Sequence, residues 1–202
     1  MRLTSYNPRN MPPKESQSKA LFDLVAAINE CVDKEQIMPC LILLYSGIEI
    51  VARMGGKPHE KTRSYFIRWV DKYILAHGRF DVTALDLYAA RCGMVHEFSP
   101  DSDLYRDGKA RRISYSWGNA SVQKVKGSIT SLSHDIAAIH LNEFTNAFMR
   151  GIPNFMDDLG KDRAAQERAE EVRSAWFTRL PTDVLDSFIA VTAATSKEQN
   201  RS

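Results

Sequence analysis

Apolar side chains recur every three to four positions along much of the chain, which is the spacing of amphipathic helices. This period predicts helices over residues 16–34, 36–54 and 61–76, a helix that opens at residue 83, and a helix over 142–159. The second helix is apolar on nearly every side, as expected of the central helix of a bundle. Pro39 falls in its first turn, where proline is tolerated, whereas Pro153 is expected to kink or split the last helix.

Two shorter segments change to the two-residue period of a β-strand. Residues 111–118 alternate Ile113, Tyr115 and Trp117 with polar or charged residues, and residues 135–141 are a weaker strand candidate. Tyr115 and Trp117 are expected to pack in the core. The alternative is that they stack on nucleic-acid bases. The sequence therefore predicts a mainly α-helical, up-and-down helical bundle with a small β element inserted before the last core helix.

The two ends of the chain lack this regular pattern. Residues 1–15 contain Asn7-Pro8 and Pro12-Pro13 and no period, which predicts a flexible N-terminal arm. The bundle is expected over residues 16–160. Residues 161–202 are expected to form a charged helix that docks through Val172 and its neighbouring aromatic residues Trp176 and Phe177, followed by a disordered tail.

Composition narrows the class of protein. Hydrophobic residues make up 44% and charged residues 26% of the chain, which excludes a disordered or fibrous protein. The net charge of +2 does not indicate a constitutive nucleic-acid binder but allows a local basic patch. Three cysteines without a CxxC pair favour a reducing cytoplasm. No signal peptide is evident, and Pro39 and Glu49 interrupt the longest apolar stretch, so we expect a cytoplasmic protein without a membrane partner.

The common catalytic signatures are missing from the sequence. It has no HExxH, no GxSxG and no Gly-rich phosphate loop with a lysine, so neither a metal nor another cofactor is expected. His134 and His140 have no carboxylate or cysteine at ligand spacing. We therefore interpret them as structural or surface histidines.

A basic run, "RDGKARR", precedes the first predicted strand and contains Arg106, Lys109, Arg111 and Arg112. Charge runs of this kind are usually solvated turns. The functional alternative is a surface that binds RNA phosphates, since cations on a short β element can contact a nucleic-acid backbone without reading its sequence.

An arginine stands on the apolar face of the helix that contains "AARCGMVHEF", residues 89–98. On a helical wheel, apolar side chains surround Arg91, and His96 lies about 140° away at the edge of this arc. A buried arginine must be paired or hydrogen-bonded. One interpretation is a structural ion pair with Glu49, with His96 favouring the helix dipole. The other is that Arg91 and His96 line a cleft between two copies of the chain.

A helical bundle whose late helix carries Arg-x4-His resembles the HEPN superfamily. The stretch "DLYAARCGMVHEFSPDSDL…GKARRISYSWG" is similar to uncharacterised bacterial HEPN-like proteins, and the likeness covers roughly residues 17 to 160. The resemblance makes Arg91 and His96 the motif pair and implies metal-independent cleavage of RNA in a homodimer cleft. Single-stranded RNA and tRNA are the candidate substrates, although the sequence does not name one. Catalytic members often place Asn, Asp or His after the arginine, where this chain has Cys92. The alternative is a non-catalytic module that binds a partner protein or a nucleotide.

The residue types suit RNA cleavage by the 2′-hydroxyl of the RNA itself. Histidine titrates near neutral pH and can remove the hydroxyl proton or protonate the leaving oxygen. Arginine is permanently charged and can bind two phosphoryl oxygens at once. Two copies would supply a base, an acid and a clamp without a metal.

Overall fold

The computed structural model describes residues 14–130 and 136–174 of the chain. The described part is mainly α-helical, as predicted, with a small two-stranded parallel sheet. Most of the predicted N-terminal arm, together with His134, Trp176, Phe177 and the predicted tail, lies outside the described residues. In chain order the elements are α1 Lys14–Asp33, α2 Ile37–Met54, α3 Thr62–Tyr73, α4 Ala84–Cys92, α5 Asp103–Arg106, β1 Arg112–Ser116, α6 Val122–Thr130, β2 Ile136–His140, α7 Leu141–Gly160 and α8 Arg163–Ser174.

Two of these helices were not predicted, and the physical reasons differ. Helix α5 is a single turn, and the hydroxyl of Ser102 before it accepts a hydrogen bond from the N–H of Tyr105. Helix α6 contains Gly127 and two hydroxyl residues, which have low helix propensity and hide the period. Helix α7 continues through Pro153, so the helix is not split there, and the alternative of a kink stays a prediction.

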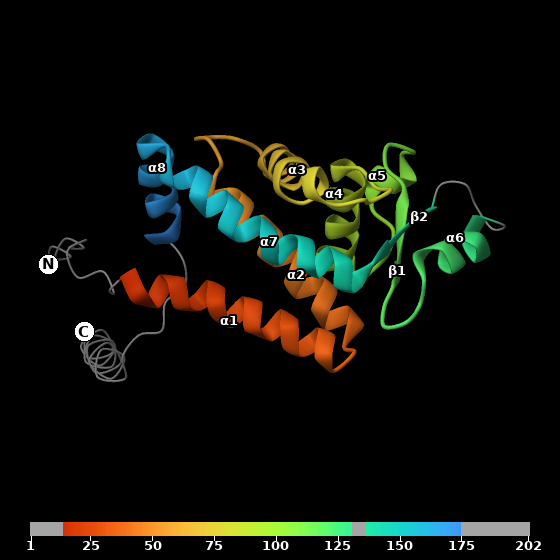
Figure 1. The fold of residues 1–202 in the computed structure, drawn as a ribbon. Coiled ribbons are helices and arrows are strands. Elements are labelled where there is room, and N and C mark those ends of the chain that lie inside the picture. Colours follow the sequence, from red (N-terminus) through yellow and green to blue (C-terminus); the bar gives the residue numbers. More distant parts are fainter. Residues whose placement is uncertain (1–13, 131–135, 175–202) are drawn as a thin grey trace, which may run out of the picture.

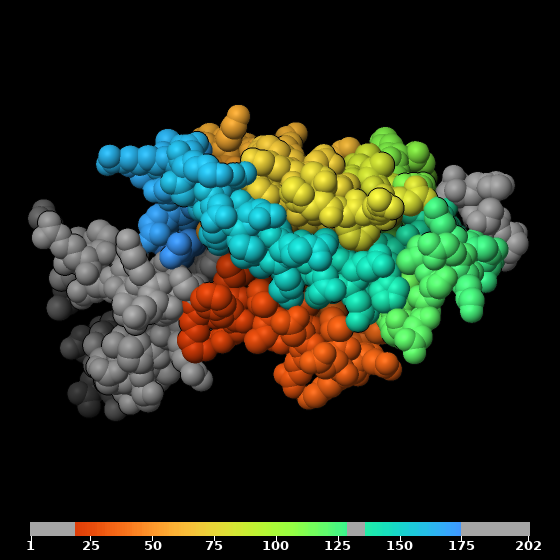
Figure 2. All heavy atoms as spheres, in the orientation of Figure 1, coloured from red at the N-terminus to blue at the C-terminus, as the bar shows by residue number. Residues whose placement is uncertain are grey.

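Helix α2 forms the centre of the core, with α1, α3, α7 and α8 packed against it (Figure 1). Figure 2 shows α7 lying across one face of the molecule between α1 and α3. The aromatic rings of Phe66, Phe144 and Phe148 are completely buried beside Leu44 and Ile48 of α2. Burial of each such side chain contributes about 1.5–3 kcal/mol to stability, so this contact region sets the positions of the other helices.

The length and composition of α2 are also those of a membrane-spanning helix, contrary to the expectation that Pro39 and Glu49 interrupt the apolar stretch enough to exclude this. Half of the apolar window is buried inside the protein. Its buried residues include Leu41, Tyr45 and Val51, which contact other helices of the same chain. A core helix passes the same test, and the packing accounts for its apolar character.

Strands β1 and β2 pair in parallel at the end of the molecule opposite α8 (Figure 1). In the register, Ile113 lies opposite Ala137, and both side chains are buried. The hydroxyl of Tyr115 is hydrogen-bonded to that of Tyr45 on α2, which ties the sheet to the core. Trp117 follows the strand and is 45% exposed, so its expected place in the core is wrong.

The start of α4, which the sequence predicted at residue 83, is fixed by a capping box. The Thr83 hydroxyl accepts a hydrogen bond from the Asp86 N–H, and the Asp86 carboxylate accepts one from the Thr83 N–H. Asp86 also accepts hydrogen bonds from the backbone and guanidinium of Arg111. Burial raises the pKa of Asp86, but these hydrogen bonds outweigh it and the net pKa is lowered. The charged carboxylate therefore joins α4 to the chain before β1.

Asp86→Asn is expected to destabilise the protein at pH 7 by about 1–3 kcal/mol, because several buried donors lose a charged acceptor. The lowered pKa means that this stabilisation is present above pH 4 and is lost as the pH falls below 4. Urea unfolding at pH 7 and pH 3 should therefore show a difference between wild type and variant that shrinks at pH 3. Asp157→Asn, on the exposed side of α7, is the matched control and should change little. A difference between wild type and Asp86→Asn that is the same at both pH values would contradict this role.

Candidate functional site

Helix α4 ends in a π-helical turn that places the side chain of His96 next to that of Arg91. The turn spans Gly93–Glu97, and the chain then reverses at Phe98, whose φ is 51°. In a π-turn the hydrogen bonds run from residue i to i+5, so a side chain five positions on lies nearly above the first. The Nη1 atom of Arg91 lies 2.6 Å from Nε2 of His96. The wheel position of His96, about 140° from Arg91 on a regular α-helix, is therefore wrong.

Gly93 is required by the loop that closes over this turn. A Cβ atom on Gly93 would lie 2.6 Å from the carbonyl oxygen of Ser99 and 2.7 Å from that of Asp101. The N–H of Ser99 donates a hydrogen bond of 3.1 Å to the Gly93 carbonyl. Such distances leave no room for a side chain, so glycine permits the approach of the two backbones.

The guanidinium of Arg91 also forms an ion pair with Glu49 of α2, which was the structural partner proposed from the sequence. The side chains of Arg91 and Glu49 are 12% and 23% exposed, whereas His96 is open to solvent. A guanidinium only donates hydrogen bonds, so Nε2 of His96 is the acceptor in this contact. The result is an arginine paired with Glu49 and an accessible imidazole beside it.

Cys92, which follows the arginine, interacts with Tyr88 one turn earlier on α4. Burial raises the pKa of Tyr88 to about 12, and its hydrogen bond with Cys92 contributes to the rise. The Cys92 side chain is half-buried. This interaction gives Cys92 a partner within α4.

The four predicted phosphate-binding cations are each paired with an acid in the structure. Arg111 is paired with Asp86, and Arg112 with Asp101. A phosphate would have to compete with these acids for the four cations. These ion pairs agree with a solvated, charged turn, and the RNA-binding role of the four residues stays a prediction. The other two pairs are Arg106 with Asp103 and with Glu97 of the π-turn, and Lys109 with Asp107.

The histidine considered earlier as a weak metal candidate is engaged elsewhere. Nε2 of His140 lies 3.2 Å from the Gly118 carbonyl oxygen. No group of three or more His, Cys, Asp or Glu side chains is arranged to hold a metal ion within residues 14–130 and 136–174. Comparison of the chain with protein-family models, curated proteins and solved structures gives no match.

Proposed function

We propose that the protein is a HEPN-like, cytoplasmic RNA endonuclease that needs no metal and acts through Arg91 and His96 where two copies meet. The observation that carries the proposal is the 2.6 Å contact between the guanidinium of Arg91 and Nε2 of His96. A π-turn and a glycine contact maintain this geometry at the end of a well-capped helix. π-turns often occur at functional sites.

The contact suggests how RNA would start the reaction. In its contact with Arg91, Nε2 of His96 uses its lone pair to accept a hydrogen bond. It cannot act as a base until the guanidinium moves. An RNA phosphate is a charged acceptor and competes for the same N–H group. Binding of the phosphate would free Nε2 while Glu49 retains the other nitrogen of the guanidinium.

The freed imidazole can then take the proton of the 2′-hydroxyl. The 2′-oxygen forms a bond to phosphorus, the bond to the 5′-oxygen breaks, and the 5′-oxygen takes a proton from an acid. Arg91 offsets the charge on the phosphoryl oxygens during this exchange. A second copy of the chain would supply the acid through its own His96, since one imidazole cannot be base and acid at the same moment.

A second candidate function, a non-catalytic interaction module, is favoured by a different observation. Phe98, directly after the π-turn, is 66% exposed and has no apolar cover within the described residues. Exposed aromatic side chains are enriched at protein interfaces. Cys92 also lacks the polar group that catalytic HEPN members often carry at this position.

Cleavage in the presence of a chelator tests the proposal. Purified protein in EDTA is expected to cut single-stranded RNA or tRNA and to leave DNA of the same sequence intact, because the nucleophile is the 2′-hydroxyl. The products are separated on a denaturing gel. An absence of cleavage on varied RNAs would favour the interaction module, and cleavage of DNA would contradict the mechanism.

A further inference from the structure

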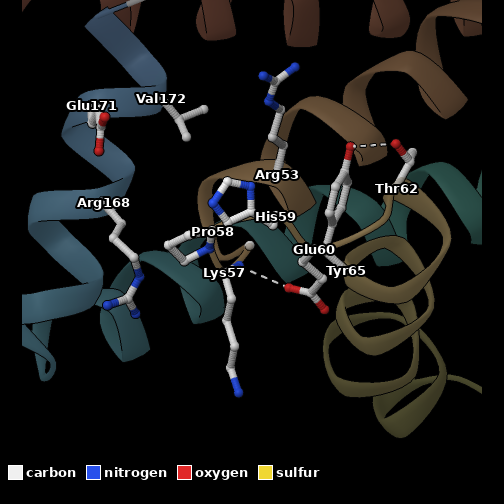
Figure 3. A pocket seen from close by; sticks show the side chains of 11 residues that line it. Arg53, Lys57, Pro58, His59, Glu60, Thr62, Tyr65, Arg168, Glu171 and Val172 are labelled. Atoms are coloured by element: carbon white, nitrogen blue, oxygen red, sulfur yellow. Dashed lines mark hydrogen bonds between the residues drawn. The ribbon is translucent and has the colours of Figure 1, made fainter.

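A groove opens between the loop that joins α2 to α3 and helix α8 (Figure 3). Its volume is about 690 Å³, which is within the range of about 300–1,000 Å³ that small-molecule sites occupy. Residues 57–60 of the loop form one wall and residues 168–172 of α8 form the other. Neither Arg91 nor His96 lines it.

Three permanently charged cations line this groove, and they come from three different segments. Arg53 stands in the last turn of α2, Lys57 in the loop, and Arg168 on α8. None of the three forms an ion pair with any of the described residues. In this they differ from the basic run at residues 106–112, where every cation is paired.

The acids of the groove do not cancel this charge. The carboxylate of Glu60 is paired with Arg68 and accepts a 2.8 Å hydrogen bond from the Lys57 N–H. The hydrogen bond from Arg68 lowers the pKa of Glu60, so this carboxylate stays ionised and neutralised by its partner. Glu171 is the remaining acid. Figure 3 shows Arg53 pointing away from Lys57 and Arg168, so Lys57 and Arg168 together supply about two positive charges to a ligand at neutral pH.

The loop also places polar and apolar groups where a ligand would lie. His59 has a φ of 60°, a conformation that residues other than glycine seldom adopt, and Figure 3 shows its ring between the loop and α8. Pro58, Tyr65 and Val172 provide apolar surface. Thr62 is the first residue of α3, whose N-terminus adds a positive partial charge to the groove.

We propose that this groove binds the phosphate monoester of a nucleotide, either free or at the 5′ end of an RNA chain. A phosphate monoester carries about −1.5 to −2 charges at pH 7, which matches the positive charge of Lys57 and Arg168. Lys57 and Arg168 contact the phosphate oxygens, and their side chains extend in the same direction in Figure 3. The apolar surface contacts the sugar or base. The inference does not depend on RNA cleavage, because the groove shares no residue with the Arg91–His96 site.

Calorimetric titration of the full chain with adenosine monophosphate, adenosine and a ribotrinucleotide with or without a 5′-phosphate tests the proposal. Adenosine monophosphate is expected to bind at least about tenfold more tightly than adenosine, because the phosphate carries the charge recognition. The trinucleotides identify the source. Binding that requires the 5′-phosphate assigns RNA ends as well, and no binding of either trinucleotide restricts the site to free nucleotides.

Arg168→Gln and Lys57→Gln should each weaken binding of adenosine monophosphate by about tenfold, without loss of fold as judged by circular dichroism. Both residues are tested because one variant still decides the question if the other fails to fold. Arg163→Gln, on the same helix but outside the groove and 91% exposed, is the matched control and should bind like wild type. Equal affinity for adenosine and adenosine monophosphate, or wild-type affinity in both folded groove variants, would overturn the proposal.

Discussion

Replacement of His96 by alanine is expected to lower the rate of RNA cleavage by about 10²–10⁴-fold, the usual contribution of a general acid or base. In a homodimer the substitution removes both imidazoles, and the proton of the 2′-hydroxyl then has no acceptor at the site. Arg91 keeps its ion pair with Glu49, so the variant leaves no buried charge without a partner. Initial rates on a labelled RNA in EDTA measure the effect.

The fold of this variant should be intact, because His96 is exposed and exposed substitutions usually change stability by less than about 0.5 kcal/mol. His77→Ala provides the matched control, since His77 is an exposed histidine in the turn after α3. Wild-type cleavage by a correctly folded His96→Ala protein would remove the proposed mechanism. Arg91→Ala is a weaker test, because it leaves Glu49 half-buried without its partner.

Gly93→Ala is expected to reduce both stability and cleavage. The added methyl group would stand 2.6 Å and 2.7 Å from two backbone carbonyl oxygens, which no change of side-chain rotamer can relieve. Either the loop at residues 99–101 or the π-turn must move, and forced shifts of this kind cost about 1–3 kcal/mol. Because the turn holds His96 over Arg91, the shift also separates the two side chains.

Urea unfolding compares this variant with Gly127→Ala in α6, where an added Cβ meets no atom within 4 Å. The control should be neutral or more stable by about 0.4–1 kcal/mol, because alanine restricts the unfolded chain. If Gly93→Ala were as stable and as active as wild type, the close approach of the two backbones would not be what holds the site.

The long core helices were predictable because their apolar residues recur at a regular period, whereas α5 and α6 were not. The Thr83–Asp86 cap and the Arg91–Glu49 pair were predictable for a second reason. The first N–H groups of a helix need acceptors, and an arginine on an apolar helix face needs an acid. The position of His96 was not. A helical wheel assumes the same rotation at every residue. The π-turn breaks this rule, and it depends on a contact between Gly93 and a loop several residues later.

The groove was equally hidden from the sequence. Lys57 and Arg168 lie on segments far apart in the chain and come together only because α2 and α8 pack against each other. Lys57 belongs to "RMGGKPH", a pattern that predicts only the end of a helix. Arg168 belongs to a run of charged residues, which predicts a solvated helix face. A charge pattern does not reveal which cations are left unpaired by the fold. For the same reason, the sequence did not show that the cations of the basic run at residues 106–112 are paired with acids and are therefore less available to RNA.

The most direct test of RNA cleavage at the Arg91–His96 site uses an RNA with a single 2′-deoxynucleotide at the cleaved position, incubated in EDTA beside the all-ribose strand. The mechanism predicts that the all-ribose strand is cut to a 2′,3′-cyclic phosphate and a 5′-hydroxyl, and that the substituted strand is not cut at that position. Product ends can be identified by mass spectrometry. Equal cutting of both strands, or products with a 5′-phosphate, would contradict attack by the 2′-hydroxyl and with it the role proposed for His96.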